Sequence, residues 1–367
     1  MSTADGMAAL KLEMPPRVPR TEYSVEIHHD LIHAVTGIDP RVWEAGEGPG
    51  NWEELEGHFA KFDGTNPWHE LYRIWDYGFQ WSTDIGNEPV GKYHTDMGHA
   101  VYTEDGSDFT EIGTCPFPTV EDALAFDPFE SLEHPDHATM VKFFSDAYAK
   151  NTERCPVGVT MTGIYPTMIS GLIAMFGWEM LLESAGTDSD RFGKLANRYG
   201  EVMQLYFNAL AECDAPVVMV HDDMVWTAGP FMHPGWYREF VFPNFKKYFE
   251  PIKESGKILC FTSDGNYTEF LPDLVECGVD CFVFEPMVDM KSFAERYGQT
   301  HAFIGNVDTR VLLSNNKEAI RGEVQRCMDI GKDCPGFFLC VGNHIPPNTP
   351  VEAALYYNEC YMELRDR

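Results

Sequence analysis

Six short apolar runs, each ending in acidic, amide or imidazole side chains, constrain the fold of this chain more than any other feature of its sequence. Stretches with helical periodicity separate the runs. Apolar strands that alternate with amphipathic helices predict a parallel sheet that is buried on both faces. We therefore predict an α/β fold, a (β/α)8 TIM barrel with an N-terminal extension. The runs are 157–163, 215–223, 257–264, 280–285, 301–308 and 336–344.

Polar side chains at the ends of these runs predict one shared site, because the chemistry of such barrels collects at the carboxyl ends of the strands. Asp222 and Asp223 close the second run, and Asp264 closes the third. Each carboxylate also has a structural alternative, since Asp often caps a helix that follows. The residues expected to surround the cavity are Asp222, Asp223, Asp264, Glu285, Asp308, Asn343 and His344.

The length of 367 residues fits a single barrel domain. Residues 1–127 are expected to form an N-terminal arm and an aromatic-rich segment, and residues 128–367 the main barrel repeats. Three prolines between Met14 and Arg20 exclude a regular helix there. Because no continuous apolar stretch has transmembrane length and no charged-then-apolar leader is visible, we expect a soluble, cytoplasmic protein without a membrane partner.

The net charge of −31, from 58 acidic and 27 basic side chains, argues against nucleic acid as a partner, because phosphate binding needs a basic face. It argues equally against a substrate that carries many carboxylates. The ten cysteines are scattered and are expected to be reduced core residues rather than a disulfide framework. Cys277 and Cys281 alone are a weak zinc signal.

The stretch from Trp43 to Trp81 is unusually aromatic. Most of its rings are expected to pack on the flank of the barrel. Some could instead line the cavity, where ring faces match a flat aromatic ligand. The residues predicted to bind substrate are Trp75, Trp81, Tyr93 and Asn343. A transient protein interface is expected around residues 60–115.

The carboxylates and the imidazole also form a candidate metal site. Adjacent carboxylates at the end of a buried strand are costly unless they are hydrated, hydrogen-bonded or bound to a cation. An imidazole with two or three carboxylates suits zinc and leaves a position open for water or substrate. The predicted metal ligands are Asp222, Asp264, Glu285 and His344. The predicted catalytic residues are Asp223, Asp264, Tyr165 and Asp308, the last two as hydrogen-bond donors.

Six segments, in a consistent order over nearly the whole chain, carry a family resemblance. They are 16–23 (PRVPRTEY), 220–234 (which contains VHDD and GPFMHP), 263–266 (SDGN), 284–286 (FEP), 305–308 (GNVD) and 343–352 (NHIPPNTPVE). With these segments the sequence resembles the uroporphyrinogen decarboxylase superfamily and, within it, the corrinoid-dependent methyltransferase branch.

Two departures from the pattern of that superfamily narrow the chemistry that the resemblance implies. The decarboxylases hold a porphyrinogen with many carboxylates through an amino-terminal Met-Arg-Gln-Ala-Gly-Arg motif, which is absent near residues 22–37. The thiol-methylating branch binds zinc with His-x-Cys and a late Cys, where this chain has Thr262, Asp264 and Asn343. The exchange of sulfur for oxygen ligands argues against activation of a thiol acceptor.

The resemblance implies the first methyltransferase of an anaerobic O-demethylase system. Such an enzyme moves a methyl group from a methoxylated aromatic to the Co(I) corrinoid (cobalamin) of a partner protein, and zinc would act as a Lewis acid at the phenolic oxygen. A homodimer is implied as well. Methyl transfer from methylcobalamin to tetrahydrofolate or a thiol, and decarboxylation of a small aromatic or pyrrolic acid, remain open. A corrinoid-binding or scaffold subunit is the non-enzymatic alternative, but the chain lacks the Asp-x-His-x-x-Gly corrinoid motif.

Overall fold

The central sheet contains six parallel strands in the order β3-β4-β5-β6-β7-β8. The computed structural model describes residues 2–41, 66–95, 101–102, 108–109 and 115–367. Each strand overlaps one of the six apolar runs, which confirms the predicted α/β fold, although β3 occupies only the end of its run. The strands are β3 (Thr162–Ile164), β4 (Val217–His221), β5 (Ile258–Thr262), β6 (Cys281–Val283), β7 (Ala302–Val307) and β8 (Phe337–Val341).

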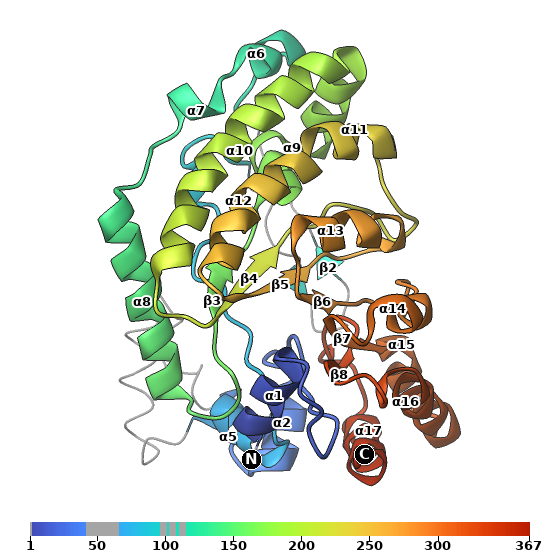
Figure 1. Cartoon of the computed structure of the whole chain (residues 1–367). Coiled ribbons are helices and arrows are strands. Elements are labelled where there is room, and N and C mark those ends of the chain that lie inside the picture. Colours follow the sequence, from blue (N-terminus) through green and yellow to red (C-terminus); the bar gives the residue numbers. More distant parts are fainter. Residues whose placement is uncertain (1, 42–65, 96–100, 103–107, 110–114) are drawn as a thin grey trace.

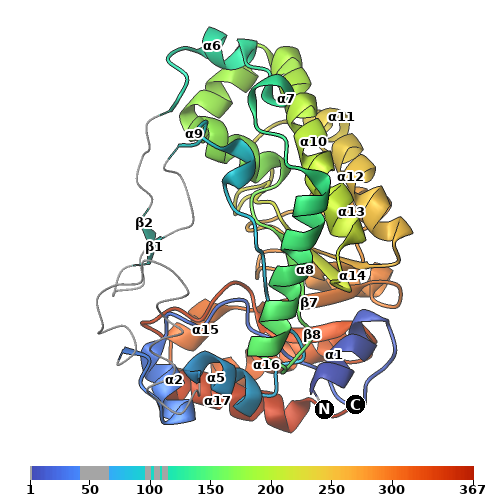
Figure 2. The same ribbon diagram turned by 90° about the vertical axis from the view of Figure 1, so that its left-hand side faces the viewer.

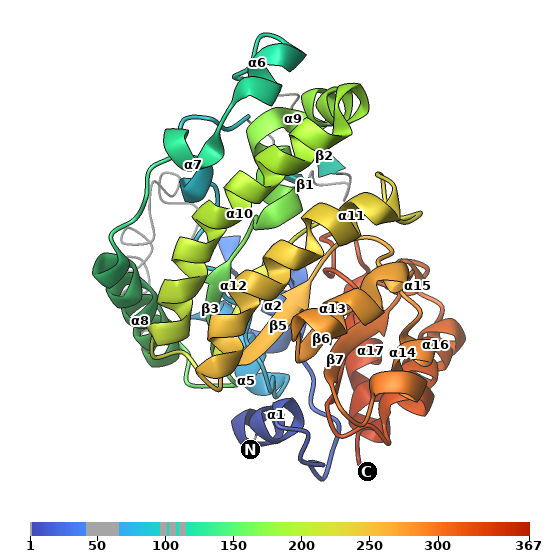
Figure 3. The ribbon, with the colours of Figure 1, turned by 45° about the horizontal axis from the view of Figure 1, so that its top comes forward.

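Two N-terminal segments close this sheet into a barrel. Residues 20–24 lie beside β8, and residues 77–85 lie beside β3. The parallel bridges that close the ring are Arg20–Leu339, Ser24–His344, Arg20–Tyr77, Phe79–Val159 and Ile85–Ile164. With the six strands they fill the eight positions of a TIM barrel, whose strands and surrounding helices are visible in Figure 3. The barrel wall therefore begins well before residue 128, where the sequence placed only an arm and an aromatic segment.

Helices surround the barrel (Figure 1). In Figure 2, α2, α5 and α17 lie together at the end that also holds both chain termini. Strand β1 (Val101–Tyr102) pairs antiparallel with β2 (Asp108–Phe109). The described helices include α1 (Ser2–Leu10), α2 (His29–Thr36), α5 (Pro67–Ile74), η2 (Glu88–Val90), α6 (Val120–Ala125), α7 (Pro128–Ser131), α8 (His137–Arg154), α9 (Met168–Thr187), α10 (Ser189–Glu212), α11 (Pro234–Phe240), α12 (Phe242–Glu254), η3 (Thr268–Phe270), α13 (Leu271–Cys277), α14 (Met290–Tyr297), α15 (Thr309–Leu313), α16 (Lys317–Gly331) and α17 (Val351–Leu364).

Prolines and capping side chains, more than the spacing of apolar residues, determine where these helices begin and end. The periodic stretch 234–249 predicts one helix, but the structure has two, α11 and α12. They are separated at Val241, and Pro243 lies in the first turn of α12, where its missing N–H is tolerated. Asn315 and Glu318 have the spacing of an N-cap and its capping partner, which predicts Asn315 as the N-cap of α16. This is wrong by one residue, because the side chain of Asn316 accepts the capping hydrogen bond from the Ala319 N–H.

Apolar side chains from alternate strand positions fill the barrel interior. Met219, Cys260, Ile304 and Cys340 belong to this cluster, and each is almost completely buried. Helix α1 packs against its amino end through Ala9 and Leu10. All ten cysteines are free thiols, as the sequence analysis predicts.

One described helix, α9, is long and apolar enough to cross a membrane by length and composition. In the structure, 67% of its apolar window is buried inside the protein. Gly177, at a φ of 68°, interrupts the helical geometry at a kink. We interpret α9 as a core helix, because its apolar surface is covered by the protein itself.

Candidate active site

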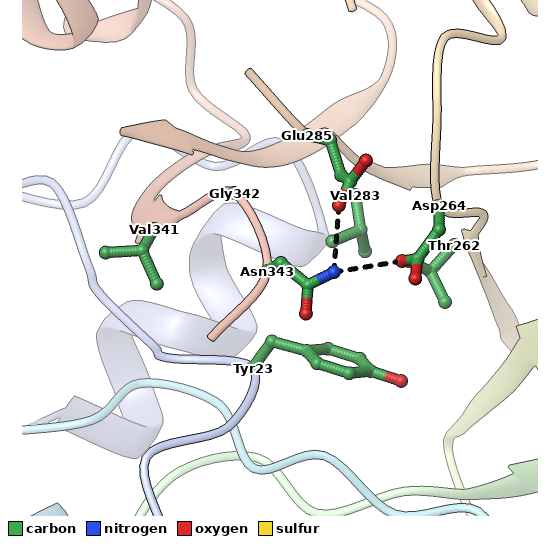
Figure 4. Close-up of a pocket in the computed structure, with 8 residues that line it drawn as sticks. All are labelled: Tyr23, Thr262, Asp264, Val283, Glu285, Val341, Gly342 and Asn343. Carbon is green, nitrogen blue, oxygen red and sulfur yellow. Dashed lines mark hydrogen bonds between the residues drawn. The ribbon is translucent and has the colours of Figure 1, made fainter. Parts of the chain in front are cut away.

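Side chains from the barrel strands meet at the carboxyl end of the barrel. Asp264 follows β5, Glu285 follows β6, Asn343 follows β8, and Tyr23 comes from the closing segment 20–24. The small cavity between them has a volume of about 10 Å³, which is room for roughly one water molecule or ion. Figure 4 shows its lining, which consists of Tyr23, Thr262, Asp264, Val283, Glu285, Val341, Gly342 and Asn343.

His221, Asp223 and Asp264 form a compact group at this mouth. One ligand atom from each lies within 4.8 Å of the other two. The Nε2 of His221 donates to Oδ1 of Asp223 at 2.8 Å, and the backbone N–H of Asp264 donates to the same oxygen at 2.9 Å. These hydrogen bonds tie the end of β4 to the loop after β5.

Two tyrosines hold His221 in place. The Tyr23 hydroxyl lies 2.7 Å from Nδ1 of His221, and the Tyr165 ring packs edge-on against the imidazole with centroids 4.0 Å apart. The Tyr165 hydroxyl donates to Oδ2 of Asp223 at 3.5 Å. His221 is only 2% exposed. Contacts at both ring nitrogens and on one ring face therefore fix the orientation of the His221 imidazole.

Asn343 links two of the carboxylates. Its Nδ2 donates to Oε1 of Glu285 at 2.8 Å and to Oδ1 of Asp264 at 3.4 Å, and both bonds are drawn in Figure 4. Its Oδ1 lies 2.6 Å from Nδ1 of His344. The other oxygen of Glu285 accepts a hydrogen bond from the Gly265 N–H at 2.7 Å. The contact with His344 orients the Asn343 side-chain amide toward the two carboxylates.

Two carboxylates at the mouth, those of Asp264 and Glu285, hold protons more strongly than ordinary acids. Desolvation in the barrel mouth, and then the negative charges of Asp223 and Glu285, raise the pKa of Asp264 well above its usual value. Because the Asp264 side chain keeps contact with solvent, we attribute this shift chiefly to the neighbouring charges. Burial likewise raises the pKa of Glu285, although hydrogen bonds from Asn343 and Gly265 oppose it.

The acidic group has the charge and the donor atoms to hold a cation. Burial lowers the pKa of His221, but Asp223 outweighs this effect, so the pKa of His221 is raised overall. The like charges of Asp223, Asp264 and Glu285 repel one another at the mouth, and a bound cation would relieve this repulsion as a proton does. One imidazole nitrogen and two carboxylate oxygens are also donors that zinc accepts, at bond lengths of about 2.0–2.2 Å. His221, Asp223 and Asp264 therefore fit a divalent metal ion after a small inward movement.

Asp222 faces away from this group. Its carboxylate accepts hydrogen bonds from the Thr167 hydroxyl and from the backbone N–H groups of Met168, Ile169 and Ser170, at 2.7–3.1 Å. The side chain is fully buried at the amino terminus of α9, where the helix dipole favours a negative charge. The prediction of Asp222 as a metal ligand is corrected, because all of its oxygens serve the first turn of α9.

Asp308 also lies outside the group. It is the N-cap of α15 and forms a salt bridge with Arg310, whose guanidinium holds the pKa of Asp308 below its usual value. It does not line the described cavity. The structure therefore gives Asp308 a capping role in place of the predicted catalytic one. His344 reaches the site through the contact of its Nδ1 with Oδ1 of Asn343.

The three predicted aromatic residues occupy different places. Trp75 is 2% exposed and packs against the buried guanidinium of Arg20. The Cζ atom of Arg20 lies 4.4 Å from the centroid of the Trp75 ring. Tyr93 packs against Phe126, with centroids 4.7 Å apart. Neither lines the described cavity, because each belongs to a separate aromatic cluster. Trp81 packs edge-on behind Tyr23, with centroids 4.9 Å apart, so it supports the wall without forming it.

His221 and Tyr23 are the site residues that the sequence prediction omitted. A signal for His221 was present: residues two apart in a strand point to the same face, so His221 and Asp223 share one face and Asp222 takes the other. No comparable signal exists for Tyr23. Its segment contributes isolated bridges rather than a periodic strand.

Polar residues of this kind at the carboxyl ends of TIM-barrel strands define an α/β-barrel enzyme. The profile of the family described as uroporphyrinogen decarboxylase (URO-D) matches residues 97–363. The chain belongs to the uroporphyrinogen decarboxylase family. This confirms the superfamily that the sequence motifs indicate.

Curated relatives share sequence with about half of this chain, and a solved structure shares its fold. A uroporphyrinogen decarboxylase from Thermus thermophilus is 29% identical over 171 residues, 47% of this chain and 48% of the relative. One from Geobacter sulfurreducens is 26% identical over 178 residues, 48% of this chain and 51% of the relative. The chain spans about half the length of the curated relatives it matches. A methyltransferase from Methanosarcina mazei shares the fold over 99% of this chain and 98% of its own, with a TM-score of 0.63 and 19% identity.

Proposed function

We propose that this protein transfers a methyl group from a methoxylated aromatic compound to the Co(I) corrinoid of a partner protein. The observation that carries the proposal is the group of His221, Asp223 and Asp264, which could hold a metal ion that would relieve negative charge on an ether oxygen. The family assignment and the shared fold with a methyltransferase support it. The pocket lining offers no lysine or arginine among its described residues, which disfavours a substrate with many carboxylates.

The reaction requires relief of charge at the leaving oxygen. The bond between the methyl carbon and the phenolic oxygen breaks, and its electron pair stays on that oxygen. The acceptor cobalt supplies both electrons of the new bond to the methyl carbon. The phenolic oxygen then takes a proton, which yields a phenol. The chain must therefore place a Lewis acid or a proton donor next to the ether oxygen.

The described side chains suit both tasks. We propose that His221, Asp223 and Asp264 hold zinc, which supplies Lewis acidity at the ether oxygen. With Nε2 of His221 used for the metal, its Nδ1–H would donate to the Tyr23 oxygen, as is usual for metal-bound imidazoles. Tyr165 positions Asp223 by its hydrogen bond. Glu285, whose pKa is raised, can hold a proton beside the site and is oriented by Asn343.

The test uses guaiacol as the methyl donor and free cob(I)alamin as the acceptor, under anaerobic conditions. Catechol formation is measured by chromatography, and loss of the Co(I) absorbance is measured in parallel. We expect turnover by the zinc-loaded protein, loss of turnover after metal removal, and recovery on zinc addition. Full activity of metal-free protein would eliminate the zinc version and leave direct protonation by a carboxylic acid.

Two variants make this test specific. Asp264→Asn keeps the shape of the side chain but removes a carboxylate ligand and proton source, so turnover should fall by about 10²-fold or more. Asp308→Asn is the matched control, because Asp308 also follows a barrel strand but pairs with Arg310 away from the cavity. Equal losses in both variants would contradict the assignment of the site.

The same samples separate the competing functions. Methyl transfer from methylcobalamin to tetrahydrofolate or to a thiol would appear as methylated acceptor without any aromatic donor. Decarboxylation would release carbon dioxide from small aromatic or pyrrolic acids. Either result without demethylation of guaiacol would replace the proposal. The predicted partner interface around residues 60–115 includes residues 60–65, 96–100, 103–107 and 110–114, which lie outside the described residues; it stays a prediction, as does the homodimer.

A further inference from the structure

Trp226 is exposed in a loop that contacts the segment after β5. It lies in the loop between β4 and α11, and 48% of its surface is exposed. Its carbonyl oxygen accepts a hydrogen bond from the Asn266 N–H at 3.0 Å. A Cβ added to Gly265 would lie 2.6 Å from that oxygen. The Trp226 loop is thus in direct contact with the segment that carries Asp264.

The indole is held in place although half of it faces solvent. Trp226 and Gly229 exchange both backbone hydrogen bonds at 2.9 Å, which closes a tight turn. Trp178 from α9 packs against the indole with ring centroids 5.6 Å apart, and Phe231 with centroids 5.5 Å apart. Their interplanar angles are 50° and 36°. A ring that is fixed before binding loses little conformational freedom when a ligand contacts it.

The small cavity at the mouth cannot hold an aromatic ring. Its volume is about 10 Å³, whereas a cavity that binds benzene measures roughly 150 Å³. A methoxylated ring whose ether oxygen reaches the acidic group must therefore lie outside this cavity, in the open mouth. There it needs an apolar surface next to Asp264, and the Trp226 loop adjoins that residue.

We propose that the aromatic ring of the methyl donor stacks against Trp226, with Trp178 and Phe231 as the support of the indole. This inference rests on the proposed function and names the substrate-binding surface of the same site. Offset stacking of two rings adds dispersion and quadrupole attraction to the burial of apolar surface. The neighbouring carboxylates disfavour ring substituents that carry negative charge. The preferred donors are therefore neutral methoxyarenes such as guaiacol.

The first test measures binding without turnover. Guaiacol is titrated into the zinc-loaded protein in the absence of cobalamin, and tryptophan fluorescence is followed. We expect quenching in the wild type and its loss in Trp226→Phe. The matched control is Trp68→Phe, which removes another of the eight tryptophans, on helix α5. Unchanged quenching in Trp226→Phe would overturn the inference.

The second test separates binding from chemistry. With cob(I)alamin present, Trp226→Ala should raise the KM for guaiacol by about tenfold, as expected for the loss of one ring contact, with kcat largely retained. Trp226→Phe should restore much of the affinity, since it keeps a ring. Phe143→Ala, which removes an exposed ring on α8, should leave both parameters unchanged.

The two proposals fail in distinguishable ways. Quenching that depends on Trp226, without any catechol formation, would refute methyl transfer from guaiacol but keep the aromatic-binding surface. Catechol formation with an unchanged KM in Trp226→Ala would keep the proposed function and refute the stacking surface.

Discussion

Asp222→Ala tests the separation of the two adjacent carboxylates into different roles. The Asp222 side chain is fully buried and accepts four hydrogen bonds at the amino terminus of α9. Three of the donors are backbone N–H groups of the first helical turn, and the fourth is the Thr167 hydroxyl. Removal of the carboxylate leaves these buried donors without an acceptor. The expected effect is therefore on stability.

The size of the loss follows from these bonds. A hydrogen bond to a charged group contributes about 1.5–3 kcal/mol, and loss of an N-cap costs about 0.5–2 kcal/mol. The four bonds do not add, because one carboxylate serves them all. We expect a loss of about 3–5 kcal/mol in the free energy of unfolding, which is large for a single substitution. With about 2.1 cal/mol/K of unfolding entropy per residue over 367 residues, the Tm should fall by about 4–6 °C.

Differential scanning calorimetry gives the Tm, and zinc titration of the folded protein gives the metal affinity. Asp222→Ala should lower the Tm strongly while the protein that remains folded still binds zinc. Asp223→Ala is the matched variant, because Asp223 faces His221 and Asp264. It should abolish zinc binding with a smaller change in Tm. An unchanged Tm in Asp222→Ala together with lost zinc binding would refute the capping role and restore Asp222 as a ligand.

Three further predictions concern the same region. Because the pKa of Asp264 is raised in the folded state, its contribution to the stability of metal-free protein is present at low pH and is lost as pH rises; the Tm of wild type minus that of Asp264→Asn should fall as the pH rises above the usual titration range of an aspartic acid, and a constant difference would contradict the shift. Gly265→Ala should cost about 1–3 kcal/mol, since Gly265 has a φ of 84° and a Cβ there would meet Trp226; urea unfolding measures this cost, and a neutral substitution would rule out the close contact of the two loops. Tyr23→Phe should weaken zinc binding by about 10–100-fold in calorimetric titration, because it removes the hydrogen-bond partner of Nδ1 of His221; unchanged affinity would exclude His221 as a ligand.

Part of the site could be predicted because parallel strands end at the same edge of a barrel. Asp264, Glu285 and Asn343 follow three different apolar runs, and the topology alone brings them together. The sequence also contained the information needed to choose between Asp222 and Asp223 as the residue that faces the site. Strand alternation places His221 and Asp223 on one face, but the prediction named Asp222 as the metal ligand and Asp223 as a catalytic residue.

Other residues could not be placed from local patterns. Trp75 and Trp81 are equally aromatic in the sequence, but a buried guanidinium more than fifty residues away decides that Trp75 packs in the core. Tyr23 lies in a segment without periodicity, and its role depends on closure of the barrel. Asp308 had a readable alternative, because Asp followed by a helix with Arg310 nearby favours an N-cap.

The position of Tyr23 depends on a buried ion pair next to it. Arg20 and Glu22 are both fully buried, an arrangement that rarely stabilises a fold by itself. The oxygens of Glu22 accept hydrogen bonds from the Val341 N–H and from the Tyr357 hydroxyl, both at 2.9 Å. Segment 20–24 pairs with its neighbours through isolated bridges and not a continuous ladder, so these polar contacts help to fix the register that a longer strand would supply. Because Tyr23 follows Glu22 directly and contacts His221, we infer that the ion pair is kept for the alignment of the site.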